Sequence, residues 1–280
     1  ILAGALLDFR MRFGASIPAT AKIIQLDLDA VQIGQNRMAD IGLVGNLGLT
    51  LQTMLEVMQE DDVSMDWSGV VETWRVKEDE AEETMRARLN SDEVPIDPQR
   101  LCREIADFVD DDTIVIGDGG DIVAQAAKVI KVPKNGAWMD PGPLGTLGVG
   151  MPFALAAQLA HPDKSVLIVY GDGSFGLNGF EFDTAVRFGL PIVGIIGNDH
   201  AWGQMLRPQA GLFGEDRLVA TELAATRYDK VVEALGGHGE LVTEPDQIRP
   251  ALERAYASGK PACVNVMMRQ DREFSGGIYV

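Results

Sequence analysis

The chain has 280 residues, of which 46% are hydrophobic and 24% are charged, as in a globular protein with one large or two ordinary domains. Its 42 acidic and 24 basic residues give a net charge of −18, which argues against a nucleic-acid partner because phosphate backbones are bound by basic surfaces. No apolar run is long enough to span a membrane, and no signal peptide is evident. The two cysteines, Cys102 and Cys263, fit a reducing compartment. We therefore expect a cytoplasmic protein without a membrane or nucleic-acid partner.

The first sixty residues alternate between strand and helix patterns, as in half of a Rossmann-like unit. We predict strands over 1–7, 21–28 and 40–44, and a helix over 47–58. Asp27 and Asp29 lie at the end of the second strand, where a ribose hydroxyl can be bound. No intact GxGxxG precedes them, so they can equally be residues that cap a loop.

Residues 61–94 are rich in charge and are predicted to form a helical linker. Trp67, Val70, Val71 and Trp74 share one helical face, which predicts a helix packed between two domains, and a charged helix over 77–90 follows. Prolines at 95 and 98 mark the start of the second domain.

The second domain, residues 95–268, reads as a doubly wound α/β fold with a parallel sheet. Its apolar runs have the length and branching of strands that are buried on both faces. The predicted strands are 113–116, 165–170, 191–196, 239–241 and 262–268, and the predicted helices are 99–109, 122–129, 151–159, 228–235 and 245–258. Residues 269–280 form a short tail that we expect to fold over a site.

The turn Gly171-Asp172-Gly173-Ser174 follows a predicted buried strand. The carboxyl edge of a parallel sheet is where open α/β folds bind ligands. Glycines let the backbone approach an anion at the helix start, and a carboxylate beside a phosphate calls for a divalent cation between them. Asp199 ends the next predicted strand and can supply a second oxygen ligand, so a magnesium-diphosphate site is predicted here.

Three stretches resemble thiamine diphosphate (ThDP) enzymes. GDGSFGLNGFEFDTAVRFGLPIVGIIGND (171–199) resembles the cofactor motif, PGPLGTLGVGMPFALAA (141–157) the pyrimidine-contacting loop, and GDGGDIVAQAA (117–127) the diphosphate-contacting turn. The resemblance is closest to the branch of acetolactate synthase, benzaldehyde lyase, 2-hydroxyacyl-CoA lyase and oxalyl-CoA decarboxylase. It implies ThDP and Mg²⁺ as cofactors, with Asp172, Asp199 and the backbone carbonyl of Ala201 as metal ligands. Asn198-Asp199 departs from the usual Asn-Asn, and the added charge should weaken the neighbouring diphosphate unless another group compensates.

The resemblance also implies the remaining site residues. The expected cofactor-binding residues are Gly120, Asp121, Ile122, Gly145, Leu147, Gly171, Asp172, Gly173, Ser174, Asp199, Ala201, Trp202, Gly203 and Gln204. Leu147 fits the bulky residue that holds the cofactor in its folded shape, although an ordinary core leucine is the alternative. Leu147 and Gln204 are the only catalytic candidates, because the cofactor-activating glutamate is expected in a preceding pyrimidine-binding domain.

The segment after Asp199 resembles the one that covers the cofactor and faces substrate, with Trp202, Met205 and Pro208 as substrate-contacting residues. Trp202-Gly203 is more like benzaldehyde lyase and some 2-hydroxyacyl-CoA lyases, and Pro208 stands where acetolactate synthases generally carry tryptophan. His200 is either an acid-base group, a role that histidine side chains often fill, or a residue that points away from the site.

The function expected is therefore a ThDP- and Mg²⁺-dependent carbon–carbon lyase or carboligase acting on 2-keto acids, like acetolactate synthase. The alternatives are a 2-hydroxyacyl-CoA lyase, a benzaldehyde lyase-like enzyme that acts on an aldehyde, and, more distantly, a non-catalytic regulatory subunit. The match places residues 1–60 in the C-terminal part of the family's central domain, which holds FAD or the ADP part of a cofactor such as CoA in relatives. We expect a homodimer or homotetramer, with the missing N-terminal half supplied by the same or another polypeptide.

Overall fold

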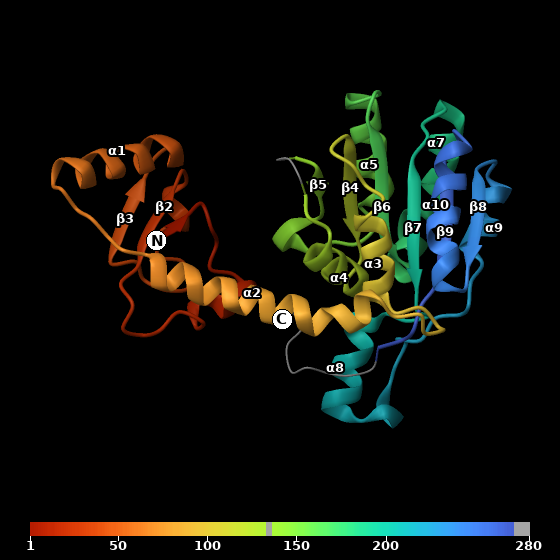
Figure 1. Ribbon diagram of the computed structural model, residues 1–280, viewed down its shortest axis with the longest axis horizontal. Helices are drawn as coiled ribbons and strands as arrows, with labels where there is room; N and C mark the ends of the chain where they lie inside the picture. Colours follow the sequence, from red (N-terminus) through yellow and green to blue (C-terminus); the bar gives the residue numbers. More distant parts are fainter. Residues whose placement is uncertain (133–135, 272–280) are drawn as a thin grey trace. The chain divides into compact units, whose positions relative to one another are not determined.

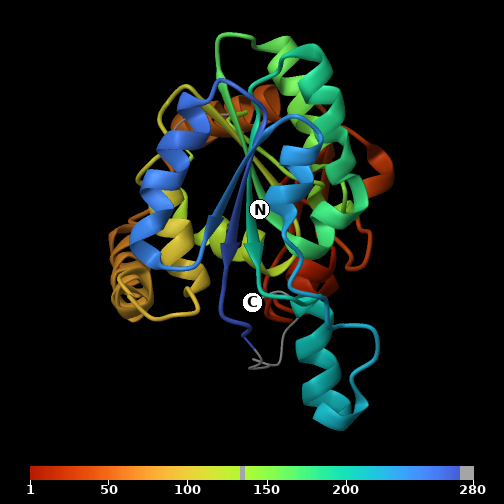
Figure 2. The ribbon, with the colours of Figure 1, turned by 90° about the vertical axis from the view of Figure 1, so that its right-hand side faces the viewer.

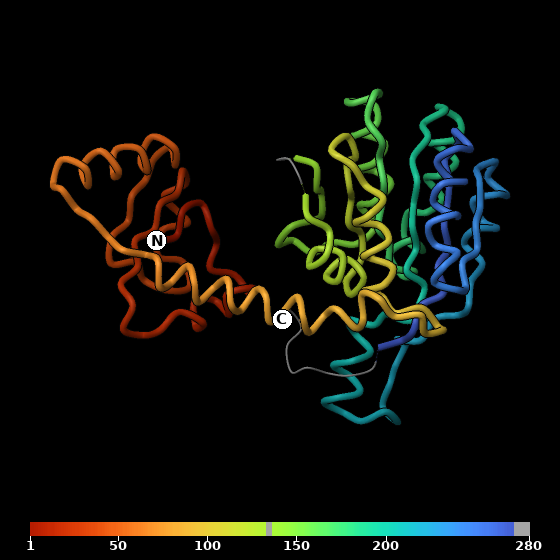
Figure 3. The backbone as a smooth tube through the Cα atoms, in the orientation of Figure 1, coloured from red at the N-terminus to blue at the C-terminus, as the bar shows by residue number. Residues whose placement is uncertain are grey.

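The computed structural model describes residues 1–132 and 136–271 (Figures 1 and 3). The chain divides into two compact units, of which the first covers Ile1–Glu78 and the second begins at Asp79. This division falls within a helix of the predicted linker, and each unit is described separately below. The linker and tail boundaries at 60, 94 and 268 stay predictions.

The first unit contains a three-stranded parallel sheet in the order β1-β2-β3. The strands are β1 (Leu2–Ala3), β2 (Ile24–Asp27) and β3 (Ile41–Val44), and the helix α1 (Leu47–Glu60) follows them. The Asn46 side chain caps α1 by accepting a hydrogen bond from the Leu49 amide at 3.1 Å. The parallel strands and following helix agree with the predicted part of a Rossmann-like domain.

Two details of the first unit bear on the predictions: the length of its first strand, and the role of Asp27 and Asp29. The strand predicted over 1–7 is wrong beyond Ala3, because Gly4 has a left-handed backbone with φ +63° that ends the extended run. Asp27 accepts a hydrogen bond from the Asp29 amide at 3.0 Å, and Asp29 accepts one from the Val31 amide at 2.9 Å. Asp29 therefore caps the short 3-10 helix η2 (Ala30–Gln32), and Asp27 binds the backbone of the loop before it, as the loop-capping alternative expected.

The predicted linker forms one continuous helix, α2 (Ser68–Leu89), rather than two. Its start is capped by Asp66, whose side chain accepts a hydrogen bond from the Ser68 amide at 2.8 Å. The predicted apolar face is exposed, with Trp67 at 57% and Trp74 at 66% of full exposure. The described residues therefore give no partner that buries this face.

The second unit is built on a six-stranded parallel sheet in the order β5-β4-β6-β7-β9-β8. The strands are β4 (Thr113–Asp118), β5 (Trp138–Met139), β6 (Ser165–Gly171), β7 (Val193–Asn198), β8 (His238–Val242) and β9 (Ala262–Met267). In β6, Val166 to Tyr170 are all buried, because helices cover both faces of the sheet.

Figure 2 shows the two helical layers on either side of this sheet. On one face, α3 (Pro98–Ala106), α4 (Asp121–Val129) and α10 (Ile248–Ala257) bury one hydrophobic cluster with Leu101, Ile122 and Leu252. On the other face, α5 (Gly150–Ala160), α6 (Asp172–Asn178), α7 (Phe182–Phe188) and α9 (Tyr228–Ala234) bury a second cluster around Tyr170 and Phe182. The predicted doubly wound α/β fold is confirmed.

The order of the strands indicates where a ligand is expected to bind. The chain passes from β4 to β5 on one side of β4, and then places β6 on the other side. The carboxyl ends of β4 and β6 therefore border a topological switch point, where open α/β sheets bind ligands. The two predicted glycine turns, at Gly119-Gly120 and at Gly171-Asp172-Gly173, follow these two strands.

One long helix was not predicted. Helix α8 (Gly203–Phe213) begins directly beyond the predicted motif and contains Pro208 in its interior. Several predicted boundaries also shift. The helix predicted over 99–109 ends at Ala106, and the one predicted over 245–258 starts as the 3-10 helix η6 (Pro245–Gln247). The strand predicted over 191–196 lies at 193–198. Residues 272–280 of the predicted tail lie outside the described residues.

Candidate cofactor-binding site

Asp172 begins α6, directly after β6, and its side chain is 1% exposed. Its Oδ1 accepts a hydrogen bond from the Gly173 amide at 2.8 Å, whereas its Oδ2 is buried and makes no hydrogen bond within the described chain. Burial raises the pKa of Asp172 to about 6, although the amides of Gly173, His200 and Ala201 act to lower it. A buried carboxylate oxygen without a partner is suited to bind a cation.

Asp199 follows the last residue of β7, which pairs with β6 in parallel. Burial, followed by the negative charges of Asp172 and Asp121, raises the pKa of Asp199 to about 7. Asp172 and Asp199 are therefore close enough to repel one another at neutral pH. This repulsion would be relieved by a divalent cation held between them.

Ala201 is buried and forms an isolated antiparallel bridge with Glu222. The bridge uses the amide of Trp202, which donates to Thr221 O at 2.8 Å, and the carbonyl of His200, which accepts from Leu223 N at 2.7 Å. It does not use the Ala201 carbonyl, the third predicted metal ligand. Within residues 1–132 and 136–271, no three His, Cys, Asp or Glu side chains form a metal-binding group, so the set of two carboxylates and one carbonyl stays a prediction.

The turn after β4 packs tightly against the turn after β6. Gly119 has φ +153°, and a Cβ atom there would lie 2.9 Å from the Gly171 backbone nitrogen and 3.5 Å from Ser174 Oγ. Ile122 lies on the other side, where a Cβ atom on Gly197 would meet its Cγ1 at 2.9 Å. The residues predicted to contact the diphosphate thus converge from β4, β6 and β7.

We expect Gly119→Ala to destabilise the protein by about 1–3 kcal/mol, because its Cβ atom would press on backbone rather than on a flexible side chain. Urea unfolding measures the loss. Gly189→Ala is the matched control, since Gly189 is also left-handed, with φ +64°, but has open space around its Cβ position. An equal loss in both variants would mean that only the backbone conformation matters, and not the contact between the two turns.

The segment that starts α8 closes the remaining side of the site. A Cβ atom on Gly173 would lie 2.6 Å from the Trp202 ring, and one on Gly120 would lie 2.2 Å from Gln204 Oε1. A Cβ atom on Gly203 would lie 2.3 Å from Asp121 Oδ2 and 3.3 Å from Asp199 Oδ2. Trp202, Gly203 and Gln204 therefore lie directly against the predicted diphosphate turns.

The other predicted residues are placed less closely. Met205 is 50% exposed, and Pro208 is half-buried inside α8. His200 has a left-handed backbone with φ +59°, and its Nε2 is buried without a hydrogen-bond partner in the described chain. Gly145 is exposed and Leu147 is half-buried rather than buried as a core leucine would be.

Asp118 is a functional candidate to which the sequence analysis assigned no role. It is the last residue of β4, it is fully buried, and it accepts hydrogen bonds from the amides of Gly148 at 2.9 Å and Gly150 at 2.7 Å. Burial raises its pKa, and the two amides lower it. Asp118 therefore ties the loop that carries Leu147 to the turn after β4. The sequence does offer a signal for Asp118, namely a carboxylate at the end of a predicted strand, thirty residues before Gly148 in the glycine-rich loop.

Comparison with known proteins agrees with this geometry. Residues 118–266 match the family model described as "Thiamine pyrophosphate enzyme, C-terminal TPP binding domain". The chain belongs to this family. The predicted family membership is thus confirmed, and both glycine turns, α8 and the strands β5 to β8 of the sheet lie within the matched thiamine diphosphate-binding domain.

Three known proteins are similar in sequence to this chain over almost its whole length. The acetolactate synthase large subunit of Mycobacterium tuberculosis is 40% identical over 95% of this chain and 48% of that protein. The 2-hydroxyacyl-CoA lyase 2 of Caenorhabditis elegans is 34% identical over the full chain and 45% of that protein. The human 2-hydroxyacyl-CoA lyase 2 is 32% identical over the full chain and 45% of that protein. The chain thus spans about half the length of the curated relatives it matches.

Among the described helices, none has the length and apolar character needed to cross a membrane.

The raised carboxyl pKa values predict an unusual pH dependence for the protein without metal. Asp172 and Asp199 have folded-state pKa values of about 6 and about 7 against an ordinary value of 3.8, so the folded chain binds more protons than the unfolded chain between these values. The free energy of unfolding should therefore fall as the pH rises from 3.8 to about 7. Thermal melts across this range test the trend, and D172N/D199N should flatten it. An equally steep trend in that variant would contradict the assignment.

Proposed function

We propose that this chain holds the cofactor in a ThDP- and Mg²⁺-dependent enzyme that cleaves or forms a carbon–carbon bond next to a carbonyl group. The observation that carries the proposal is the pair of repelling carboxylates, Asp172 and Asp199, at the switch point of a thiamine diphosphate-binding domain. The unpartnered Oδ2 of Asp172 and the close glycine turns both fit a cation bound to a diphosphate.

In this proposal, Asp172, Asp199 and the Ala201 carbonyl hold Mg²⁺. The backbone of Gly120–Ile122 and of Gly171–Ser174, at the starts of α4 and α6, would bind the diphosphate. Leu147 orients the two rings of the cofactor, and Gln204, beside Gly120, is a candidate polar contact. When bound, thiamine diphosphate supplies an electron sink next to the reacting carbonyl. Trp202, against Gly173, excludes water from this side of the site.

The preferred substrate is a 2-keto acid that is joined to a second carbonyl compound, as the name of the acetolactate synthase relative suggests. A 2-hydroxyacyl-CoA, cleaved to or formed from formyl-CoA and an aldehyde or ketone, is the second candidate. Its support is the Trp202-Gly203 pair and Pro208, which resemble the lyases more than the synthase, and relatives named 2-hydroxyacyl-CoA lyase 2. A benzaldehyde lyase-like reaction would use the same surface of Trp202, Met205 and Pro208.

The assembly proposed is a homodimer or homotetramer, in which the activating glutamate comes from a pyrimidine-binding domain of the same or another polypeptide. The chain spans 45–48% of the relatives' length, which supports a further domain that supplies this glutamate, and the oligomeric state rests on the resemblance to the family. An FAD, ADP or CoA moiety is proposed for the Rossmann-like unit, although Asp27 and Asp29 are engaged as caps. A non-catalytic regulatory subunit is the distant alternative and would bind ThDP without turnover.

Product analysis tests the proposal and separates the two substrates. The complete polypeptide, with ThDP and Mg²⁺, is offered pyruvate in one reaction and a 2-hydroxyacyl-CoA in another. Acetolactate from the first supports the synthase, whereas an aldehyde or ketone plus formyl-CoA from the second supports the lyase. Tight ThDP binding without either product would favour the regulatory subunit.

A further inference from the structure

The proposed magnesium-diphosphate site contains more negative charge than its predicted ligands require. Asp121 Oδ2 and Asp199 Oδ2 would lie 2.3 Å and 3.3 Å from the same Cβ position on Gly203, so the two carboxylates converge there. Asp172, the other predicted carboxylate ligand, begins α6 directly after β6, the strand that pairs with β7. Asp121 thus adds a third negative charge beside the two predicted carboxylate ligands, and this charge would repel a diphosphate group unless a positive side chain offsets it.

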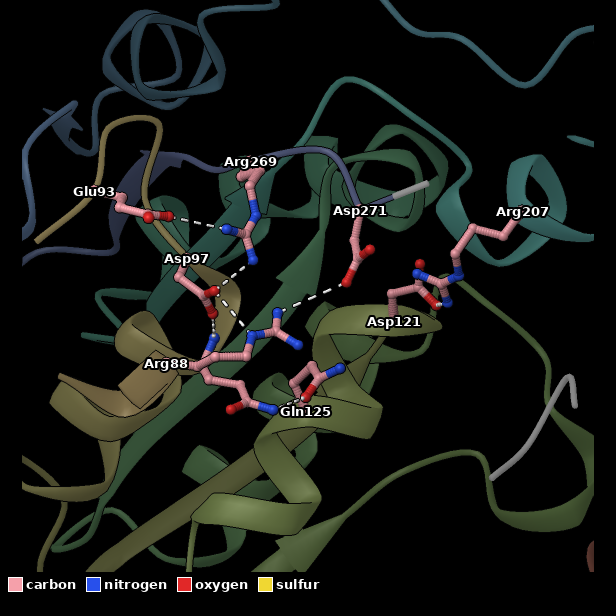
Figure 4. Close-up of polar contacts among 9 residues, drawn as sticks. Arg88, Glu93, Asp97, Asp121, Gln125, Arg207, Arg269 and Asp271 are labelled. Carbon is pink, nitrogen blue, oxygen red and sulfur yellow. Dashed lines mark hydrogen bonds and ion pairs between the residues drawn. The ribbon is translucent and has the colours of Figure 1, made fainter. Parts of the chain in front are cut away.

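Among the described residues, Arg207 binds this cluster through Asp121. It lies on α8, one helical turn after Gly203, and its Nη2 donates to Asp121 Oδ1. Both side chains are largely buried, with 23% of Arg207 and 22% of Asp121 exposed, so solvent screens the pair only in part. Figure 4 shows the Arg207 guanidinium lying against the Asp121 carboxylate.

The contact with Arg207 leaves the second oxygen of Asp121 facing the site. Asp121 Oδ2 is buried and has no hydrogen-bond partner in the described chain. Because Arg207 fixes Oδ1 of Asp121, it also fixes the direction in which Oδ2 points, toward Gly203 and Asp199. The effect of Arg207 on the site is thus both electrostatic and geometric.

The neighbouring arginines are engaged elsewhere. Arg88 Nε and Arg269 Nη2 contact Asp97 Oδ2 at 2.9 Å and 2.6 Å, and Arg269 also contacts Glu93 at 3.0 Å (Figure 4). Arg88 Nη2 lies 3.7 Å from Asp271 Oδ2. These two arginines neutralise their own carboxylates, whereas Arg207 binds a carboxylate of the site itself.

We propose that Arg207 is a positioning residue that offsets the charge of Asp121 and thereby lets the site combine an aspartate at position 199 with a bound diphosphate. This inference rests on the proposed function. It explains how the chain accommodates Asp199, where the family motif usually closes with an uncharged asparagine.

Equilibrium titration of ThDP into the complete polypeptide at saturating Mg²⁺, followed by tryptophan fluorescence, tests the inference. We expect R207Q to raise the Kd of ThDP about tenfold or more, because it leaves the Asp121 charge unpaired. R207K keeps the charge and should stay within about threefold of the wild type. The matched control is R187Q, which removes an exposed arginine paired with Asp183 at 2.7 Å on α7, and should bind ThDP normally.

A double-mutant comparison separates charge compensation from general damage. In a D199N background, where the charge to be offset is smaller, R207Q should weaken ThDP binding by less than about threefold. The inference is overturned if R207Q binds as the wild type does, or if its loss is as large in the D199N background. If R207Q does not fold, D121N/R207Q, with two neutral side chains of similar shape, decides: binding within about threefold of the wild type supports the inference, and a tenfold loss overturns it.

The outcomes also distinguish this inference from the proposed function. If the wild-type polypeptide does not bind ThDP in the presence of Mg²⁺, the proposed function fails. If the wild type binds and R207Q binds equally well, only the role of Arg207 fails.

Discussion

Replacing Asp172 by alanine is expected to abolish Mg²⁺-dependent binding of ThDP, with Kd rising at least about a hundredfold. Asp172 is the most buried carboxylate of the proposed metal set, and its Oδ2 has no partner in the described chain. Without it, Mg²⁺ would keep only Asp199 and a backbone carbonyl as protein ligands, too few for a hard cation that also bridges a diphosphate. Calorimetric titration of ThDP with Mg²⁺ present measures the loss.

The same variant should be more stable than the wild type without metal, because it removes a buried carboxylate whose pKa is raised to about 6. The matched control is D183A, which removes a half-exposed carboxylate paired with Arg187 on α7. D183A should retain ThDP binding. If D172A bound ThDP within about threefold of the wild type, the metal assignment would be wrong.

Asp118→Ala is expected to lower the free energy of unfolding by about 2–5 kcal/mol, because it leaves two buried amides, those of Gly148 and Gly150, without an acceptor. For a domain of this size the melting temperature should fall by roughly 5–15 °C. The loop that carries Leu147 would lose its attachment to β4, so ThDP affinity should fall as well. Differential scanning calorimetry and ThDP titration measure the two effects.

Asp140→Ala provides the control for the Asp118 variant. Asp140 also accepts a backbone hydrogen bond in this loop, from the Gly142 amide at 2.7 Å, but it is exposed, so water can replace it. A loss of stability in D140A as large as in D118A would show that the loop does not depend on the buried attachment.

The parallel sheet of the second unit was predictable because its strands are continuous apolar runs that only a sheet covered on both faces can bury. The predicted runs of β4, β6, β7, β8 and β9 each overlap the observed strand. Residues 1–7 misled the prediction because the run is apolar, whereas the backbone turns at Gly4. Hydrophobic pattern alone does not report a left-handed glycine.

Helix α8 was missed because Gly203 and Pro208 within it are poor helix formers, and local propensity argued against a helix. Tertiary contacts outweigh this propensity: Trp202 packs on Gly173, Gln204 on Gly120, and Leu206 is fully buried. The linker with two tryptophans was predicted as two helices because its composition changes near Lys77. That change of composition does not interrupt α2.

For the candidate site, the sequence predicted residues that stand next to glycines in recognisable turns, such as Asp172 and Gly120. It did not predict interactions between residues far apart in the chain. Asp118 contacts amides thirty and thirty-two residues away, and Arg207 contacts Asp121 over eighty-six residues. Such pairs depend on the order of strands in the sheet, which no local pattern encodes.

The most direct test of the account is a titration of ThDP into the complete wild-type polypeptide, with Mg²⁺ in one sample and a chelator in the other. The account predicts saturable binding of one ThDP per chain with Mg²⁺, little binding with the chelator, and none of thiamine, which lacks the diphosphate. Equal ThDP binding with and without Mg²⁺, or no binding in either sample, would contradict it.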